Sequence, residues 1–105
     1  MTKKTALIAA GVVAILIVAF FTFRKEPRGA LLFERERCNE CHAINGKGGG
    51  VGPNLSYVGR RRSRDYIISQ VKNPKAHNPD SVMPSFARLP EQDIQDLADY
   101  LSNLK

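Results

Sequence analysis

Apolar and polar residues are unevenly spread along this chain, and their pattern divides it into two parts. Residues 6–23 form an apolar run that contains no charged residue. A helix of that length spans roughly 27 Å, which is close to the thickness of the hydrocarbon core of a bilayer. The rest of the chain alternates short amphipathic stretches with loops. The pattern therefore predicts a transmembrane anchor at residues 1–23, a short linker at 24–28 and a small domain at 29–105.

The domain shows the spacing of apolar residues that is typical of helices. Ser63 is a suitable N-cap for one of them, and Asn73 ends it because a residue before proline avoids the helical conformation. Clustered glycines and prolines indicate loops between the helices. No stretch alternates as a strand does, so we expect an all-α fold. Helices are predicted at residues 29–40, 64–72 and 91–104, and loops at 43–53 and 75–89.

The apolar run has two interpretations, a cleaved signal peptide and an uncleaved anchor. A signal peptide has an apolar region of ~7–15 residues that ends at a small-x-small cleavage site. This run is longer, and no such site follows it. We therefore interpret it as a membrane anchor. Lys3 and Lys4 slightly favour a cytoplasmic N-terminus under the positive-inside rule.

Charge and cysteine content limit the possible functions. The formal net charge is +6, but residues 28–105 hold twelve basic and nine acidic residues. This balance does not indicate nucleic-acid binding, although a short basic run lies at residues 60–64. A domain this small has a marginal core and usually needs a cofactor, metal or disulfide. Cys38 and Cys41 lie so close in the sequence that a disulfide between them would stabilise little.

The two cysteines belong to a motif that points to a cofactor. Cys38, Cys41 and His42 form the pattern C-x-x-C-H, which is the attachment motif of a c-type haem. At this spacing each thiol can bond to one vinyl group, and the imidazole becomes an axial ligand of the iron. The alternatives are a thioredoxin-like redox pair and half of a zinc site. The first lacks a βαβ setting and the second lacks another pair of ligands, so we favour one covalent haem c.

Met83 is the predicted second axial ligand. A thioether is a soft ligand, and Met/His ligation raises the reduction potential of cytochromes c. One alternative is that Met83 fills a gap in the core, which is a common role of methionine. Another is that His77, the only other histidine, takes the second axial position. Because a loop methionine before Pro84 is an unusual core filler, we predict His42 and Met83 as the iron ligands.

Residues 29–105 resemble the small single-haem class I cytochrome c family, in its membrane-anchored bacterial form. The resemblance implies an all-α, cytochrome c-like domain around one haem, in which the first and last helices cross at Gly29. It implies that the carbonyl oxygen of Pro53 orients His42. It also implies that Leu55 packs on the haem and that Arg60 approaches a propionate. The matching motifs are Gly29-x-x-x-Phe33, Cys38-x-x-Cys41-His42, Gly52-Pro53-Asn54-Leu55, Gly59-Arg60, Asn73-Pro74, Met83-Pro84 and Leu97-x-x-Tyr100.

These features predict an electron carrier and not an enzyme. Two protein ligands leave the iron no open position for a substrate. No catalytic triad, carboxylate pair or phosphate-binding loop competes with this interpretation. The alternative from another class is a haem-based sensor or small-ligand binder, in which the sixth ligand is labile.

Location and partners follow from the same resemblance. Haem is attached to such proteins outside the cytoplasm, which places the domain on the periplasmic side of the cell inner membrane. We expect membrane lipid and other redox proteins or complex subunits as partners, and no nucleic acid. A linker of five residues reaches at most ~18 Å, so a fixed relay in a larger membrane redox complex is favoured over a tethered shuttle.

Overall fold

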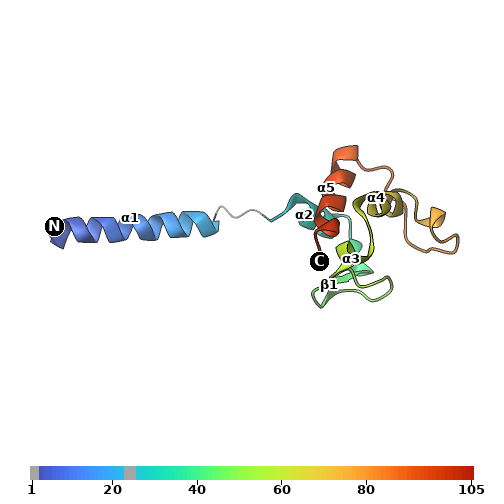
Figure 1. Ribbon diagram of the computed structural model, residues 1–105, viewed down its shortest axis with the longest axis horizontal. Helices are drawn as coiled ribbons and strands as arrows, with labels where there is room; N and C mark the ends of the chain where they lie inside the picture. The colour runs from blue at the N-terminus through green and yellow to red at the C-terminus, as the bar shows by residue number, and fades with distance from the viewer. Residues whose placement is uncertain (1–2, 23–25) are drawn as a thin grey trace.

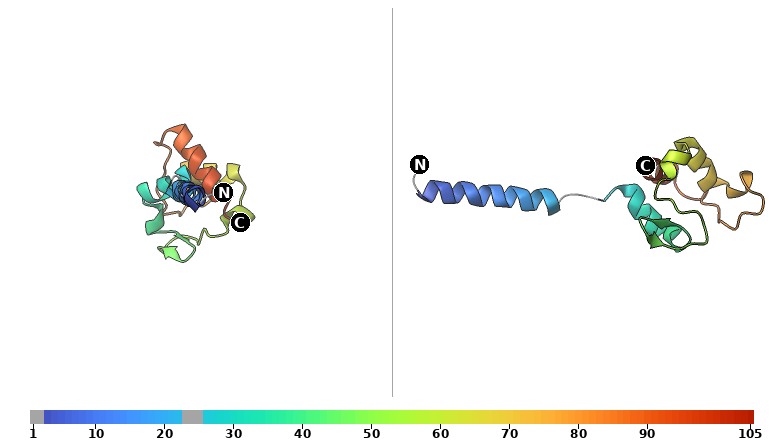
Figure 2. Two further views of the ribbon diagram at one scale, coloured as in Figure 1. Left: turned by 90° about the vertical axis from the view of Figure 1, so that its left-hand side faces the viewer. Right: turned by 60° about the horizontal axis from the view of Figure 1, so that its bottom comes forward.

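The chain forms a long N-terminal helix and a helical domain (Figure 1). The computed structural model describes residues 3–22 and 26–105. Helix α1 (Lys3–Thr22) extends away from the domain, and the right-hand view of Figure 2 shows the same separation. Among the described residues, no helix combines the length and hydropathy that a membrane crossing requires. Both ends of the predicted anchor and residues 24–25 of the predicted linker lie outside the described residues.

The domain is mostly helical, as the sequence predicts. Helix α4 (Arg64–Lys72) has the predicted bounds, and the hydroxyl of Ser63 caps it by accepting a hydrogen bond of 3.1 Å from the backbone N–H of Tyr66. The other elements, in chain order, are α2 (Arg28–Arg35), the 3-10 helix η1 (Cys38–Glu40), β1 (Ala43–Ile44), β2 (Lys47–Gly48), α3 (Val58–Arg61), the 3-10 helix η2 (Pro74–Ala76) and α5 (Glu91–Ser102).

A short hairpin corrects the prediction that the domain contains no strand. β1 and β2 pair antiparallel, with Ala43 opposite Gly48. The two residues between the strands, Asn45 and Gly46, have φ values of 51° and 80°. Positive φ at both central positions is the requirement of a type I′ turn, which an Asn-Gly pair favours. The signal was present in the sequence, but the many surrounding glycines favoured a plain loop.

The first helix of the domain is shorter than the predicted 29–40. It ends at Arg35, and Arg37 adopts a positive φ of 64°. A left-handed residue at this place stops a helix because it turns the backbone away from the helical hydrogen-bond pattern. The chain then tightens into η1, so Cys38 begins a new turn instead of continuing α2.

Helices α2 and α5 cross at Gly29, as the resemblance implies. A Cβ at this position would lie 2.3 Å from the Cβ of Tyr100 and 2.4 Å from the backbone oxygen of Asp96. Only glycine allows the two backbones to approach this closely. The hydrophobic core on these helices includes Leu32 and Leu97, which are both at least 98% buried, with exposed fractions of 2% and 1%. The crossing therefore positions the helices that form one side of the domain.

A buried carboxylate ties both ends of α2 to the first turn of α5. Asp93 is only 6% exposed. It accepts hydrogen bonds of 2.5 Å from Arg28 and 3.0 Å from Arg35. These hydrogen bonds hold the pKa of the Asp93 carboxyl below its ordinary value of 3.8. Arg28 also donates a 2.5 Å hydrogen bond to Asp96, whose pKa is lowered in the same way.

We expect Asp93→Asn to remove part of the acid dependence of stability. Because the folded-state pKa of Asp93 lies below its ordinary value of 3.8, the carboxylate stabilises the fold above that value. Its contribution is lost as the pH falls through the lower, folded-state pKa. At neutral pH the variant should unfold at a lower temperature, by on the order of 5 °C.

Thermal unfolding of the holoprotein between about pH 7 and about pH 2.5 measures this effect. The matched control is Asp65→Asn, which neutralises an exposed carboxylate in the first turn of α4. An Asp93→Asn variant with the same acid dependence as the wild-type protein would contradict the assignment.

Candidate haem-binding site

A cavity of about 910 Å³ lies beside the turn that follows α2 and the loop that precedes α5. Arg60, predicted to approach a haem propionate, does not line this cavity. Its exposed guanidinium lies 4.7 Å from the ring centroid of Tyr57. Its neighbours Arg61 and Arg62 line the cavity instead. The predicted site residues that do line it are Cys38, Cys41, His42, Pro53, Leu55 and Met83.

The imidazole of His42 is oriented by a backbone carbonyl. Its Nδ1 atom lies 2.8 Å from the carbonyl oxygen of Pro53. A carbonyl oxygen only accepts hydrogen bonds, so Nδ1 carries the proton and Nε2 presents its lone pair. A histidine whose other N–H is held in this way is a well-oriented metal ligand. This is the contact that the resemblance implied for Pro53.

Both cysteines lie on one tight turn, and neither forms a disulfide. The backbone N–H groups of Cys41 and His42 both donate to the carbonyl oxygen of Cys38, at 3.2 and 3.0 Å. The turn therefore brings two thiols and an imidazole to the wall of one cavity. Burial raises the pKa of the Cys38 thiol to about 11, whereas Cys41 is exposed.

Gly52 lies directly against the ring of His42. A Cβ at position 52 would lie 2.5 Å from Cε1 and 2.8 Å from Nδ1 of the imidazole. Contacts this short are not tolerated, so any side chain at this position must displace the ring. The hydrogen bond between His42 and Pro53 therefore depends on glycine at position 52.

We expect Gly52→Ala to raise the reduction potential of the holoprotein. Displacing the ring weakens the hydrogen bond from His42 to Pro53, and an imidazole without that partner is a poorer donor to ferric iron. The expected shift is on the order of 60 mV, which corresponds to a tenfold change for one electron.

A redox titration measures the shift, and Gly50→Ala is the matched control because a Cβ at Gly50 meets nothing within 4 Å. Equal potentials in the two variants would contradict the role of Gly52.

Met83 is placed at the cavity by contacts with α4. The side-chain amide of Gln70 donates a hydrogen bond of 3.5 Å to its sulfur atom. Beyond Met83, the hydroxyl of Ser85 donates to the carbonyl oxygen of Lys72 at 2.6 Å. The backbone N–H of Phe86 donates to Val71 at 2.9 Å. Sequence reasoning missed Gln70 and Ser85 because only the folded chain brings them near Met83.

His77, the alternative axial ligand, also lines the cavity. Its Nε2 atom lies 3.1 Å from the hydroxyl oxygen of Ser69, and its ring centroid is 4.2 Å from that of Tyr66. His77 is exposed, whereas Met83 is half-buried. The imidazole of His77 is thus held against α4, and Met83 is the more buried of the two candidate ligands.

The donor set fits a haem better than it fits a bound zinc ion. Within residues 3–22 and 26–105, no group of three or more His, Cys, Asp and Glu side chains is arranged to hold a metal ion, which is what the zinc alternative requires. The cavity instead offers two thiols outside any disulfide, an imidazole with Nε2 unprotonated and a thioether. Its wall includes the apolar side chains of Phe33, Leu55 and Leu97.

The helical fold and this donor set define a small domain that binds a haem of the c type. Residues 27–105 match the family model described as Cytochrome c, and the chain belongs to the cytochrome c family. It therefore carries covalently bound haem c with its iron, and haem-based electron transfer is the activity of this domain.

Two similar proteins extend the comparison. The crystal structure of the c-type cytochrome SorU from Sinorhizobium meliloti matches with a TM-score of 0.54 at 25% identity, over 76% of this chain and 93% of that one. The chain is also 28% identical over 86 residues to cytochrome c oxidase subunit 2 of Alkalihalophilus pseudofirmus. That match covers 74% of this chain and 25% of the relative, so this chain spans a quarter of the relative's length.

Proposed function

We propose that this protein is a single-electron carrier whose haem iron is ligated by His42 and Met83. The observation that carries the proposal is that both side chains line the cavity that also holds the two cysteines. With both axial positions taken by protein, a change of oxidation state needs little rearrangement and no position remains for a substrate. The arrangement therefore favours an electron carrier over an enzyme.

Each remaining site residue has a role in holding the cofactor. Cys38 and Cys41 form the thioether bonds, Pro53 orients the imidazole, and Leu55 contributes to the apolar wall. The propionate contact that the resemblance gives to Arg60 suits the neighbouring arginines 61 and 62 better, because these line the cavity. When bound, the haem supplies a reversible one-electron couple.

Haem staining and spectroscopy test this proposal. The denatured chain should retain haem on a gel, and the reduced holoprotein should be six-coordinate and should not bind carbon monoxide readily. A reduced protein that binds carbon monoxide at once has a labile sixth ligand. That outcome would contradict the carrier and would favour a haem-based sensor or small-ligand binder.

We further propose that the apolar run at residues 6–23 attaches the protein to the cell inner membrane, with the haem domain on the periplasmic side. Large apolar side chains of α1 are exposed, including Leu7 at 74%, Ile8 at 68% and Leu16 at 62%. They do not pack against the domain, from which α1 extends (Figure 1). Since no described helix meets the requirements of a crossing, membrane attachment needs a direct test. Release of the protein from membranes by alkaline washing would contradict the proposal.

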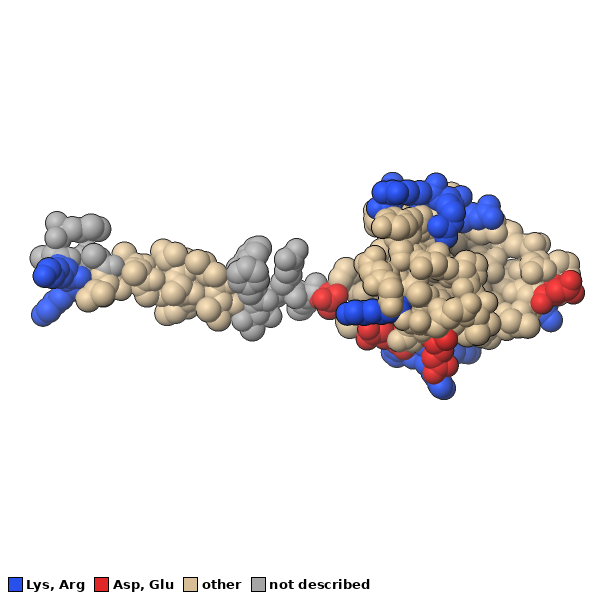
Figure 3. All heavy atoms as spheres, turned by 90° about the horizontal axis from the view of Figure 1, so that it is seen from below, with Lys and Arg blue, Asp and Glu red and all other residues tan. Residues whose placement is uncertain are grey.

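A fixed relay in a larger redox complex is the role we propose for the attached domain. The similarity to part of an oxidase subunit supports it, as does the short linker. Lys and Arg side chains gather along one edge of the domain (Figure 3), which suits contact with an acidic surface of another redox protein. Extraction in mild detergent tests this role: elution as a lone chain would contradict the relay and favour a tethered shuttle.

A further inference from the structure

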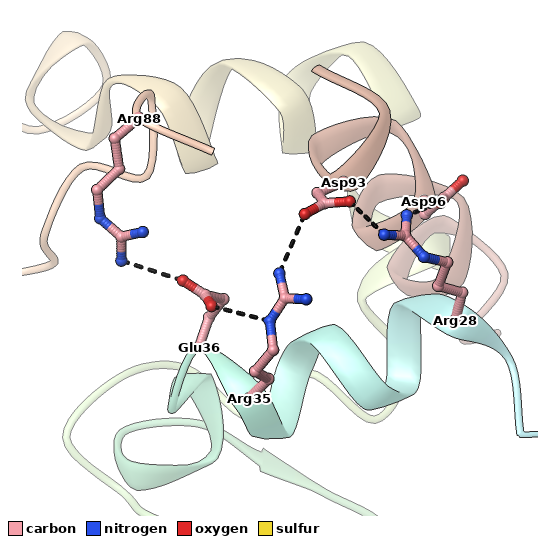
Figure 4. Close-up of polar contacts among 6 residues, drawn as sticks. All are labelled: Arg28, Arg35, Glu36, Arg88, Asp93 and Asp96. Atoms are coloured by element: carbon pink, nitrogen blue, oxygen red, sulfur yellow. Dashed lines mark hydrogen bonds and ion pairs between the residues drawn. The ribbon is translucent and has the colours of Figure 1, made fainter. Parts of the chain in front are cut away.

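Six charged side chains form a continuous network (Figure 4), and the last two of them line the cavity. It begins on α5, passes to the start of α2, returns to the first turn of α5, crosses to the end of α2 and finishes in the loop that follows Met83. Three guanidinium groups alternate with three carboxylates along it. In order along the network the residues are Asp96, Arg28, Asp93, Arg35, Glu36 and Arg88.

Glu36 is the member of this network nearest to the haem-attachment motif. It lies two residues before Cys38, and its side chain is only 11% exposed. One carboxylate oxygen accepts from Arg35 at 3.2 Å, and the other accepts from Arg88 at 3.0 Å. Arg35 is itself bound to Asp93 at 3.0 Å, so the Glu36 carboxylate is linked through Arg35 to α5 as well as directly to Arg88.

Arg88 lies on the other side of the network, five residues after Met83, and its side chain is 67% exposed. Glu36 and Arg88 both line the cavity that Met83 lines. Among the described residues, the other hydrogen bonds that join this loop to the domain all involve α4. Met83 accepts one from Gln70, Ser85 and Phe86 donate to backbone carbonyl oxygens of α4, and His77 contacts Ser69. The ion pair thus adds a link between the Met83 loop and the turn before Cys38.

We propose that the Glu36–Arg88 ion pair positions the Met83 loop against the haem-attachment turn and so sets how firmly the iron keeps its methionine. The inference rests on the proposed ligation by Met83. Arg88 acts through Glu36, and neither residue touches the iron. Loosening the pair allows the loop to move away from the attachment turn, so an external ligand competes better with the thioether sulfur.

Imidazole binding to the ferric holoprotein measures how firmly the methionine is held. Glu36→Gln and Arg88→Gln are each expected to raise imidazole affinity by about two- to fivefold, which is the size expected for one partly exposed ion pair. The double variant should bind no more tightly than either single variant, since both remove the same link. Arg88→Lys should restore affinity toward the wild-type value.

Reduction potentials separate this role from a simple charge effect. If the two charges act only through space, removing Arg88 lowers the potential and removing Glu36 raises it. If the pair holds the loop, both variants lower the potential, because both weaken methionine ligation. Opposite shifts with unchanged imidazole affinity would overturn the proposal.

The matched control is Arg64→Gln, which breaks the ion pair between α4 and Asp99 at 2.5 Å, outside the cavity. It should leave imidazole affinity unchanged, and an equal rise in this variant would overturn the proposal by showing a general loss of stability. A wild-type ferric protein without the long-wavelength band of methionine ligation would instead overturn the proposed ligation by Met83, and this inference with it. Wild-type ligation together with unaffected Glu36 and Arg88 variants would overturn only the role of the ion pair.

Discussion

Replacing Met83 with alanine is expected to leave the haem attached and to lower its reduction potential by on the order of 0.1–0.3 V, within the range that axial ligands span. The haem is retained because thioether bonds from Cys38 and Cys41, and not the axial ligand, hold it to the chain. A thioether favours ferrous iron, and an oxygen ligand in its place favours ferric iron. The open position should also bind carbon monoxide. A redox titration and carbon monoxide difference spectra measure the two effects.

Two further variants serve as controls for this result. Lys75→Ala changes an exposed residue of η2 that does not line the cavity, and its potential should match that of the wild-type protein. Met83→His closes the position with a nitrogen ligand, so carbon monoxide binding should weaken again while the potential stays low. An unchanged potential in Met83→Ala would show that Met83 is not a ligand, and His77 would become the leading candidate because it lines the same cavity.

The helix that the sequence predicted with the observed bounds carries local signals at both ends, whereas the helix predicted at 91–104 ends earlier, at Ser102. Residues 64–72 have a serine N-cap and a proline after the C-terminus, and the structure gives these bounds. The helix predicted at 29–40 failed because its end depends on the left-handed conformation of Arg37, which no glycine or proline marks. The short helix α3 was missed for a similar reason, since four residues are too few for a periodic pattern.

The same distinction between local and tertiary information decides which parts of the site could be predicted from the sequence. Cys38, Cys41 and His42 are adjacent in the sequence, so their chemistry can be read without a fold. The contact of His42 with Pro53 was available only through the resemblance, because eleven residues separate the two. The pairing of Glu36 with Arg88 spans 52 residues. No sequence pattern specifies that contact, which exists because α2 and the loop before α5 meet at the cavity.

The largest loss of stability is expected from Gly29→Ala. The added Cβ would meet the Cβ of Tyr100 at 2.3 Å and the backbone oxygen of Asp96 at 2.4 Å. Neither atom can rotate away, because one is fixed to the backbone and the other belongs to it. α2 and α5 must therefore separate, at a free-energy cost of about 3 kcal/mol, the upper end of the usual range for overpacking. This outweighs the gain in helix propensity, which is ~1 kcal/mol at most.

Thermal unfolding of the holoprotein should show a fall in Tm of roughly 10–20 °C for Gly29→Ala. Gly50→Ala is again the matched control, since its Cβ meets nothing within 4 Å, and its stability should stay within about 0.5 kcal/mol of the wild-type value. Because thioether bonds hold the haem to the η1 turn, the Gly29→Ala protein should keep its haem even where its stability is reduced. A Tm equal to that of the control would contradict the prediction, because it would mean that α2 and α5 can move apart at no cost in free energy.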